Sequence, residues 1–332
     1  MTTYNEAKPI LGKIRAARRI LLSLHRSPDA DSVGSNLALL LALEKIGKTD
    51  VEVISPDKVP EYVLFLHGAD RVRQEDIVYK DLQGFDLFIT LDASAPHMLT
   101  RNVAVPTFPD TLAVIVIDHH ATNTKYGQIN LVDDKVSSTS ELLFNLTDQW
   151  NVELDKDIAT CLLTGIAGDT GTFRWAITKD TLSAAGSLLE CGADFGEINF
   201  NLYQRVPIEC FRFAAKVFEK LQFEKMGKCT FAWVSISAAE GDGRVEKDSS
   251  FRVIDLLKSI EGVDFALLVT QDKDEPGLIK GNLRSRTDFD VSKIAVSLGG
   301  GGHKAAAGFA IRGEFEDVVK RVLGTIKDVV KG

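Results

Sequence analysis

The sequence of 332 residues has few cysteines and no long apolar run. Its four cysteines form no C-x-x-C pair, which argues against a zinc–thiolate site, and they are too sparse for a disulfide framework. Its longest apolar runs, Leu37–Leu43 among them, are far shorter than the roughly 20 residues that span a bilayer. The N-terminus also lacks the apolar segment of a signal peptide. These absences predict a cytoplasmic protein with reduced thiols and no membrane partner.

Positive charge is also scarce, because the net charge is −8. Proteins that hold long nucleic acids by counterion release need a basic face, so a long nucleic acid is not expected as a partner. An acidic enzyme still accepts an anionic substrate when bound divalent ions reverse the local charge. A small phosphorylated substrate at a metal site is therefore compatible with this composition.

The first half of the chain alternates strand-like and helix-like segments, which is typical of an α/β fold with a parallel sheet covered by helices on both faces. The pattern Ser138-x-x-Glu141 is a capping box that opens a helix. Helices are also predicted over Ser35–Ile46 and Asp157–Ile166. Short apolar runs bounded by turn residues predict four strands: Arg19–Leu24, Val51–Ile54, Asp86–Leu91 and Ala113–Ile117.

The second half predicts a smaller α/β domain behind a helical connection. The segment Leu182–Gln222 is mostly helical in pattern, with one connecting helix over Pro207–Leu221. The length of the chain also favours two domains. We therefore predict a catalytic domain over 1–185, a helical linker over 186–224 and a substrate-binding domain over 225–332. Its predicted strands are Cys229–Ile236, Phe265–Thr270 and Gly281–Arg284.

Polar side chains follow three of the predicted strands. His25 and Asp29 follow the first, Asp92 follows the third, and Asp118-His119-His120 follows the fourth. Ligands of open parallel sheets bind at the carboxyl ends of the strands. These side chains are therefore expected to share one cleft.

The segment His25-Arg-Ser-Pro-Asp29-Ala-Asp31 carries a histidine and two aspartates on a loop before a helix. Imidazole and carboxylate together suit Mn²⁺ or a similar divalent ion. The plainer interpretation is a helix N-cap with surface charges. Asp169 lies in a glycine-rich stretch over 165–171, predicted as a turn, and taken alone it would be an ordinary turn residue.

The order of these motifs resembles the DHH phosphoesterase superfamily, whose metal motifs are D-x-D, a lone aspartate, D-H-H and a fourth aspartate. The chain also resembles the subgroup whose DHH-associated C-terminal domain carries a G-G-G-H motif, here Gly300–His303, preceded by Asn282–Arg286. In length and in its paired L-R-S and G-G-G-H motifs it is most similar to the stand-alone nanoRNase and 3′-phosphoadenosine-5′-phosphate phosphatase group.

The resemblance implies a two-metal phosphoesterase that uses Mn²⁺, with Co²⁺ or Mg²⁺ as alternatives. Asp92 would bridge the two ions. His120 would be the catalytic residue that faces the substrate phosphate, and Asp118 would hold a histidine in place. One ion would be held by His25, Asp29 and Asp92, and the other by Asp31, Asp92, His119 and Asp169.

The resemblance also assigns substrate binding to the C-terminal domain. Arg284 offers a planar fork to a phosphate, and glycines let backbone N–H groups reach an anion. The alternative for the glycine run is a flexible loop. The implied substrate-binding residues are Arg284, Ser285, Gly300, Gly301, Gly302 and His303.

Three functions remain open at this point. The first is hydrolysis of short oligoribonucleotides, of 3′-phosphoadenosine-5′-phosphate, or of both. The second is a cyclic dinucleotide phosphodiesterase of the cyclic di-AMP type. The third is a nucleotide-binding module without catalysis, which the full set of six metal residues disfavours. A homodimer is expected only by the resemblance.

Overall fold

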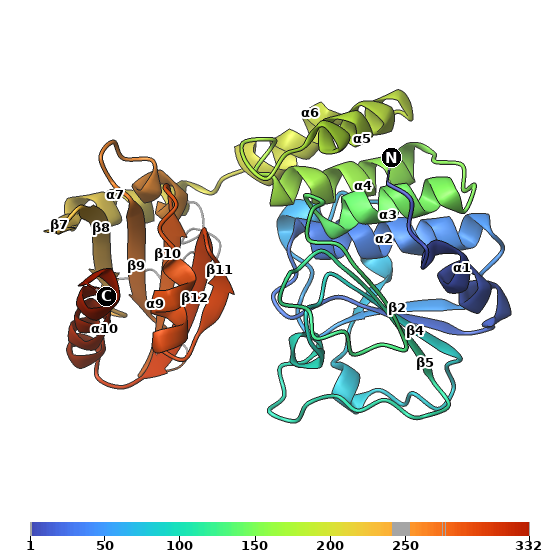
Figure 1. Ribbon diagram of the computed structural model, residues 1–332, viewed down its shortest axis with the longest axis horizontal. Coiled ribbons are helices and arrows are strands. Elements are labelled where there is room, and N and C mark those ends of the chain that lie inside the picture. Colours follow the sequence, from blue (N-terminus) through green and yellow to red (C-terminus); the bar gives the residue numbers. More distant parts are fainter. Residues whose placement is uncertain (1, 241–252, 274, 276, 332) are drawn as a thin grey trace. The chain divides into compact units, whose positions relative to one another are not determined.

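The computed structural model describes residues 2–240, 253–273, 275 and 277–331, which form two compact units over 1–205 and 206–332. Each unit contains one β-sheet with helices packed against it (Figure 1). The predicted α/β class is confirmed. Among the described residues, no helix has both the length and the apolar character that a membrane crossing requires.

The sheet of the first unit is parallel throughout its described pairings, with the strand order β3-β2-β1-β4-β5-β6. The strands β1, β2 and β3 follow one another toward one edge of the sheet. The chain then returns to the other side of β1, where β4, β5 and β6 follow one another toward the opposite edge. Such a reversal creates a crevice at the carboxyl ends of the strands on either side of it. The strands are β1 (Ile20–Ser23), β2 (Val51–Ser55), β3 (Val72–Gln74), β4 (Leu87–Leu91), β5 (Ala113–Asp118) and β6 (Ile129–Val132).

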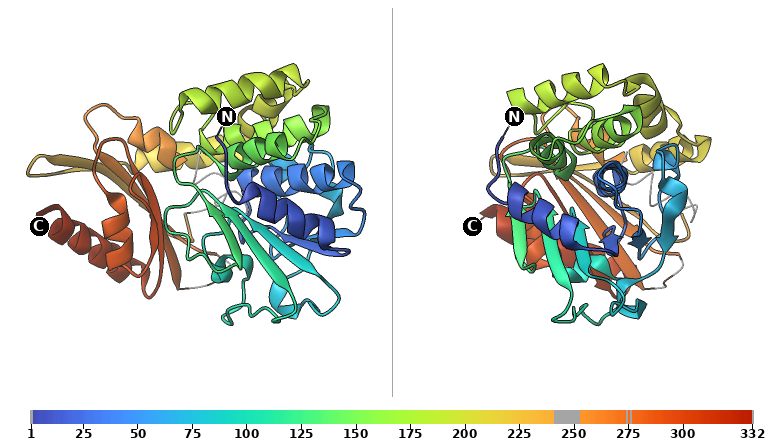
Figure 2. Two further views of the ribbon diagram at one scale, coloured as in Figure 1. Left: turned by 45° about the vertical axis from the view of Figure 1, so that its right-hand side comes forward. Right: turned by 90° about the vertical axis from the view of Figure 1, so that its right-hand side faces the viewer.

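One face of this sheet carries a layer of α-helices (Figure 2). Their apolar side chains form the main core with Leu22, Ile89 and Ile117 of the central strands. The other face is covered by short 3-10 helices and loops around Phe88 and Leu99, including η3 (Ile77–Tyr79) and η4 (Pro96–Leu99). The α-helices described in the first unit are α1 (Ala7–Ala16), α2 (Ala30–Lys45), α3 (Thr139–Gln149), α4 (Lys156–Asp169), α5 (Lys179–Glu190) and α6 (Phe195–Asn199).

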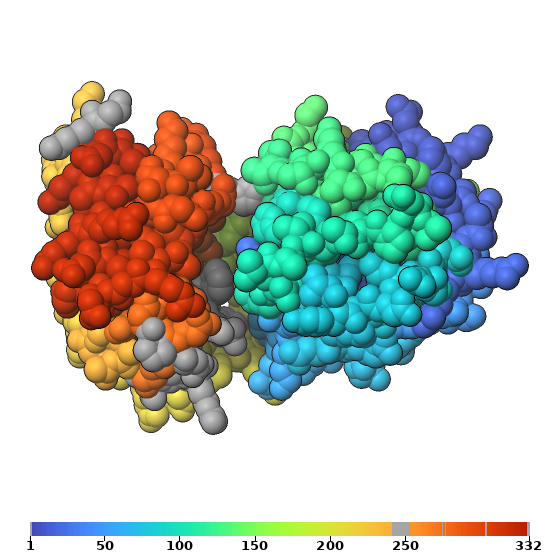
Figure 3. Space-filling model, turned by 90° about the horizontal axis from the view of Figure 1, so that it is seen from below, coloured from blue at the N-terminus to red at the C-terminus, as the bar shows by residue number. Residues whose placement is uncertain are grey.

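The sheet of the second unit is mixed, with the order β11-β12-β10-β9-β8-β7 in its described part. Helices α9 and α10 cover one face, and α10 forms much of the visible surface of this unit (Figure 3). Helix α7 and the helical residues 253–258 cover the other face. The bounds are α7 (Ile208–Glu219), β7 (Gln222–Met226), β8 (Cys229–Ile236), β9 (Phe265–Gln271), β10 (Leu278–Ser285), α9 (Val291–Ser297), β11 (Gly301–His303), β12 (Ala306–Arg312) and α10 (Phe315–Lys331).

The segment 186–224, predicted as a linker, divides between the two units. Ile198 of α6 and Leu202 of the π-helical turn η5 (Phe200–Gln204) belong to the core of the first unit. Phe213 and Val217 of α7 belong to a core cluster of the second. The chain therefore passes from one unit to the other between η5 and α7, close to Arg205.

Candidate metal centre

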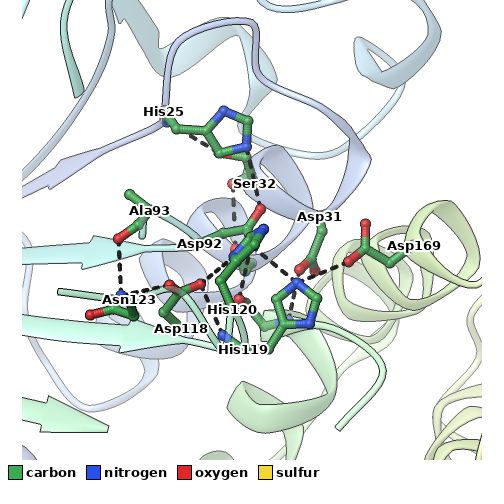
Figure 4. A network of polar contacts seen from close by, with 12 residues as sticks. His25, Asp31, Ser32, Asp92, Ala93, Asp118, His119, His120, Asn123 and Asp169 are labelled. Atoms are coloured by element: carbon green, nitrogen blue, oxygen red, sulfur yellow. Dashed lines mark hydrogen bonds and ion pairs between the residues drawn. The ribbon is translucent and has the colours of Figure 1, made fainter. Parts of the chain in front are cut away.

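The acidic and histidine residues predicted as ligands come together in the first unit (Figure 4). His25 follows β1, Asp92 follows β4 and His119 follows β5, at the carboxyl ends of neighbouring strands. Asp31 lies in the first turn of α2 and Asp169 is the last residue of α4. The sequence pattern predicts Asp31 on a loop and Asp169 in a turn, and both predictions are wrong, because each residue lies within a helix.

His25, Asp29 and Asp92 form one cluster that can hold a cation. His25 Nε2 lies 3.7 Å from Asp29 Oδ1 and 3.4 Å from Asp92 Oδ2. The opposite ring nitrogen, Nδ1, lies 2.9 Å from the carbonyl of Arg26 and donates to it in the tautomer that leaves Nε2 as an acceptor. The ring is therefore oriented by the backbone so that Nε2 faces the two carboxylates.

Asp29 also caps the helix that begins beside it. Its Oδ1 accepts from the N–H groups of Asp31 and Ser32 at 3.1 and 3.0 Å. The plainer interpretation of the first motif, a helix N-cap, is therefore correct for this residue and coexists with its place in the cluster. Capping fixes one carboxylate oxygen toward α2, at the end where the helix dipole favours negative charge.

Asp31, His119 and Asp169 form a second cluster, and Asp92 lies between the two. His119 Nε2 is 3.1 Å from Asp169 Oδ2 and 3.6 Å from Asp92 Oδ1. This nitrogen is buried and, among the described residues, has no hydrogen-bond partner. A buried nitrogen without a partner, surrounded by carboxylate oxygens, fits a divalent cation.

The N-terminus of α3 holds Asp31 in place. The backbone N–H of Thr139 donates to Asp31 Oδ2 at 2.7 Å, and that of Ser140 donates to Oδ1 at 2.9 Å. The Thr139 hydroxyl donates to Asp92 Oδ1 at 3.1 Å. The first two residues of α3 therefore position the carboxylates of Asp31 and Asp92. The sequence gives no sign of these contacts, because Thr139 and Ser140 are far from both aspartates along the chain.

Asp92 has a strained backbone. Its φ is 59°, in the left-handed region that a residue with a Cβ seldom adopts. Its N–H donates to the carbonyl of Ile117 at the end of β5, which ties this conformation to the sheet. Strain of this kind costs about 1–3 kcal/mol and is concentrated at functional sites. It directs the Asp92 carboxylate into the space between the two clusters.

Asp118 organises the paired histidines. Its Oδ1 accepts from the N–H of His119 at 2.9 Å and lies 2.7 Å from His120 Nδ1. Its Oδ2 accepts from Asn123 Nδ2, which also donates to the carbonyl of Ala93. These contacts agree with the predicted supporting role of Asp118, whereas nothing in the sequence indicated Asn123.

The electrostatics among the side chains of the two clusters favour bound protons. Burial lowers the pKa of His119, but the carboxylates of Asp169, Asp92 and Asp31 outweigh it and raise that pKa well above its ordinary value. Burial and the charges of Asp92 and Asp169 raise the pKa of Asp31 well above the usual range. Burial likewise raises the pKa of Asp169 to about 6. A divalent cation would replace these protons as the compensating charge.

Close packing of two helices sets the separation of Asp31 and Asp169. A Cβ added at Gly34 of α2 would lie 2.5 Å from the carbonyl oxygen of Cys161 on α4. A Cβ at Gly168 would lie 2.5 Å from the Cβ of Ala30, and one at Gly165 would lie 2.6 Å from Asp31 Oδ1. Glycine is therefore required where α2 and α4 cross, because any side chain would force the two acidic residues apart.

Comparison with known proteins agrees with this geometry. Residues 19–166 match the DHH family, N-terminal domain, and residues 229–332 match the DHHA1 domain. The chain is 33% identical, over 93% of its own length and 89% of the other's, to a Thermus thermophilus protein named bifunctional oligoribonuclease and PAP phosphatase NrnA. The chain belongs to the DHH family of phosphoesterases. The resemblance stated from its motifs is therefore confirmed.

This DHH protein is also similar to a cyclic dinucleotide phosphodiesterase and to a protein of solved structure. It is 25% identical, over 96% of its length, to the cyclic-di-AMP phosphodiesterase PdeA of Listeria monocytogenes, but it covers only 49% of that protein. Among solved structures, an exopolyphosphatase-related protein from Bacteroides fragilis matches 98% of the chain with a TM-score of 0.83 and 26% identity. The whole chain therefore shares its two-domain fold with a solved structure.

The DHHA1 domain carries the predicted substrate residues, and most of them also have structural contacts. Arg284 lies on β10, where its Nη1 donates to the carbonyl of Leu283 and its Nε lies 3.8 Å from Asp255 Oδ1. The Ser285 hydroxyl donates to the carbonyl of Thr287 at 2.9 Å. His303 belongs to β11, but its side chain lies outside the described part of the structure.

Gly301 and Gly302 of the glycine run lie in the edge strand β11, whereas Gly299 and Gly300 precede it. A Cβ at Gly300 would overlap the carbonyl of Gly308 on β12, and Gly302 has a φ of 138°. These two glycines are needed so that β11 can approach β12. Gly301 is exposed and has open space where a Cβ would be. The assignment of Gly300, Gly301 and Gly302 to an anion site stays a prediction.

Proposed function

We propose that this DHH protein hydrolyses phosphate esters in short oligoribonucleotides, and in 3′-phosphoadenosine-5′-phosphate, with two divalent ions, Mn²⁺ by preference. The observation that carries the proposal is the pair of clusters on either side of Asp92. The name of the Thermus thermophilus relative, which matches almost the full chain, supports the substrate class. An exonucleolytic mode on short substrates and a cytoplasmic location are part of the same proposal, and a homodimer stays a prediction.

The two ions would have distinct ligand sets. Bound there, they would supply positive charge to the phosphate and lower the pKa of water. Nitrogen and carboxylate oxygen ligands without thiolate suit Mn²⁺, while Co²⁺ and Mg²⁺ stay as alternatives. His25, Asp29 and Asp92 would hold one ion, and Asp31, Asp92, His119 and Asp169 would hold the other.

His120 is the proposed catalytic residue of the chain. Burial lowers its pKa, but the hydrogen bond to Asp118 and the charge of Asp92 outweigh it and raise the pKa above its ordinary value. A protonated imidazole beside the cluster donates a hydrogen bond to the phosphate, and then a proton to the leaving oxygen. Asp118 keeps the ring in the orientation in which Nδ1 faces the carboxylate.

The DHHA1 domain carries the residues that are proposed to bind substrate. Arg284, Ser285, Gly300, Gly301, Gly302 and His303 are proposed to bind the part of the substrate that is not cleaved. The backbone of Gly301 and the guanidinium of Arg284 are the groups best suited to a second phosphate. The predicted domain boundaries at 185 and 224 stay as predictions.

The test is hydrolysis of four substrates in Mn²⁺: a 5′-phosphorylated dinucleotide, 3′-phosphoadenosine-5′-phosphate, cyclic di-AMP and pyrophosphate. We expect turnover of the first two and its loss in Asp92→Ala. Asp148→Ala, an exposed aspartate on α3, is the matched control and should retain activity. Cleavage of cyclic di-AMP alone would move the chain to the second predicted function, which the match to PdeA favours. No hydrolysis with any divalent ion would refute the proposal.

A further inference from the structure

The segment that follows Asp169 has an unusually strained backbone. Thr172, Phe173 and Ala176 have φ values of 62°, 60° and 53°, and Gly171 has 54°. Three residues with a Cβ in the left-handed region within five positions cost about 1–3 kcal/mol each. Such a conformation persists only where the surrounding structure imposes it, so the segment has a role beyond connecting α4 to α5.

The strained segment fixes the indole of Trp175 beside the metal centre. Trp175 Nε1 donates to the backbone carbonyl of Asp169 at 2.8 Å. The ring lies so close to Gly171 that a Cβ there would overlap it. The guanidinium of Arg174 lies 4.7 Å from the ring centroid and is itself held by the carbonyl of Gly171. The ring is therefore anchored at its nitrogen and lies close to the backbone of Gly171, with the guanidinium of Arg174 over it.

This indole is exposed although the segment is firmly held. Trp175 is 37% exposed, whereas the other two tryptophans, Trp150 and Trp233, are 4% and 8% exposed. A tryptophan that only closed the end of α4 would bury its ring, because most of its stabilising effect comes from buried apolar area. A rigid, exposed aromatic surface next to a polar site instead fits a flat aromatic ligand.

A second observation on the same segment also indicates a ligand. The Thr172 hydroxyl oxygen is buried and has no hydrogen-bond partner in the part of the chain that the structure describes. An unsatisfied buried hydroxyl costs about 1–3 kcal/mol, and such groups are rare in native proteins. In the sequence it lies between Asp169 of the metal cluster and Trp175, on the same strained segment.

We propose that Trp175, supported by Gly171 and Arg174, stacks on a nucleobase of the substrate. The proposal rests on the proposed function, because it presumes a nucleotide at the metal centre. Stacking accepts any base, since every base has an aromatic face, and a purine gives the larger overlap. The segment over 170–176 is then the base-binding platform of the DHH domain, and Trp175 is a positioning residue rather than a catalytic one.

The direct test is intrinsic fluorescence in Mg²⁺, with AMP as the probe and ribose 5-phosphate as the control without a base. Stacked adenine should quench the exposed indole, and ribose 5-phosphate should leave the emission unchanged. Because Trp150 and Trp233 are buried, the quenching should disappear in Trp175→Phe. Quenching that persists in this variant would overturn the proposal, as would AMP that competes with the substrate without quenching.

Kinetics give the second test. For a 5′-phosphorylated diadenylate, Trp175→Ala should raise KM about 5- to 150-fold, because base stacking is of that strength. Trp175→Phe should restore much of the loss. For the matching abasic dinucleotide, Trp175→Ala and wild type should have the same KM. Equal effects on both substrates, or none on either, would refute base stacking.

Two more variants separate this proposal from misfolding and from the proposed function. Gly171→Ala should reproduce the KM effect of Trp175→Ala, because its Cβ would displace the indole. Tyr79→Ala removes a 76% exposed aromatic from the same unit and should leave KM unchanged. If wild-type protein hydrolyses nothing, the proposed function fails, whereas AMP quenching still decides whether Trp175 binds a base.

Discussion

Gly165→Ala tests whether the close crossing of α2 and α4 sets the geometry of the metal centre. The added Cβ would overlap the Ser140 hydroxyl and lie 2.6 Å from Asp31 Oδ1. Rotation of the hydroxyl would not relieve the clash, because the Ser140 Cβ itself would be only 2.8 Å away. The helices must therefore separate, and Asp31 must shift from the N–H groups of α3.

The magnitude follows from three contributions. Overpacking a buried position costs about 1–3 kcal/mol. Weakening one hydrogen bond to the Asp31 carboxylate costs about 1.5 kcal/mol, and replacing a helical glycine by alanine recovers about 1 kcal/mol. The net loss in the free energy of unfolding is about 2.5 kcal/mol. For a unit of this size that corresponds to a decrease in Tm of roughly 5–10 °C.

The assay is thermal unfolding of the metal-free protein, followed by the same scan with Mn²⁺. Gly186→Ala is the matched control, because this glycine of α5 has open space around it and alanine should raise Tm by about 1–3 °C. Gly165→Ala should also show a smaller increase in Tm on adding Mn²⁺ than wild type. Equal Tm values and equal Mn²⁺ responses for Gly165→Ala and wild type would refute the reasoning.

Three further predictions concern metal binding and the second unit. Mn²⁺ should raise the Tm of wild type, and Asp92→Asn should abolish most of that increase; an unchanged increase would exclude Asp92 as a shared ligand. The Mn²⁺-induced increase in Tm should be larger at pH 8 than at pH 5.5. The pKa values of His119 and Asp169 are raised, that of Asp169 to about 6, so Mn²⁺ must displace protons from them at low pH. A Tm increase that stays constant or falls with pH in calorimetric scans would contradict this prediction. Gly300→Ala should lower the Tm of the second unit by several degrees, whereas Gly301→Ala should leave it unchanged, since only the first Cβ meets the neighbouring strand; equal effects in thermal scans would show that β11 does not need a close approach to β12.

The sequence predicted the central strands well, and it identified histidine and aspartate residues that the structure brings together, because both depend on strong local patterns. Buried strands such as β1 and β4 are largely apolar runs, and His25 and Asp92 come just after their ends. It missed β3, β6, β7, β11 and β12. Of these, the edge strands β3 and β7 are largely exposed and therefore lack the apolar pattern. Edge strands are identified by their neighbours rather than by their own residues.

Supporting residues of the site were beyond reach for a related reason. Thr139 contacts Asp92 across 47 positions, and its N–H contacts Asp31 across 108. Contacts of this kind arise from tertiary packing, and common residues such as threonine carry no local signal of them. Gly165 belongs to a glycine-rich stretch of the sequence, but its role depends on the packing of α4 against α2, which the sequence does not show.

The hydrogen bonds of Asp118 determine where the chain can be lengthened. This carboxylate closes a short ring through His120 and Asn123, and Asn123 ties the ring to the carbonyl of Ala93 after β4. An insertion within 119–123 would open that ring and turn both histidines away from the cluster. The neighbouring stretch over 101–110 is mostly exposed, with Val103 fully so. A tag or reporter domain introduced into this protein is therefore best inserted there, at a distance from the paired histidines along the chain.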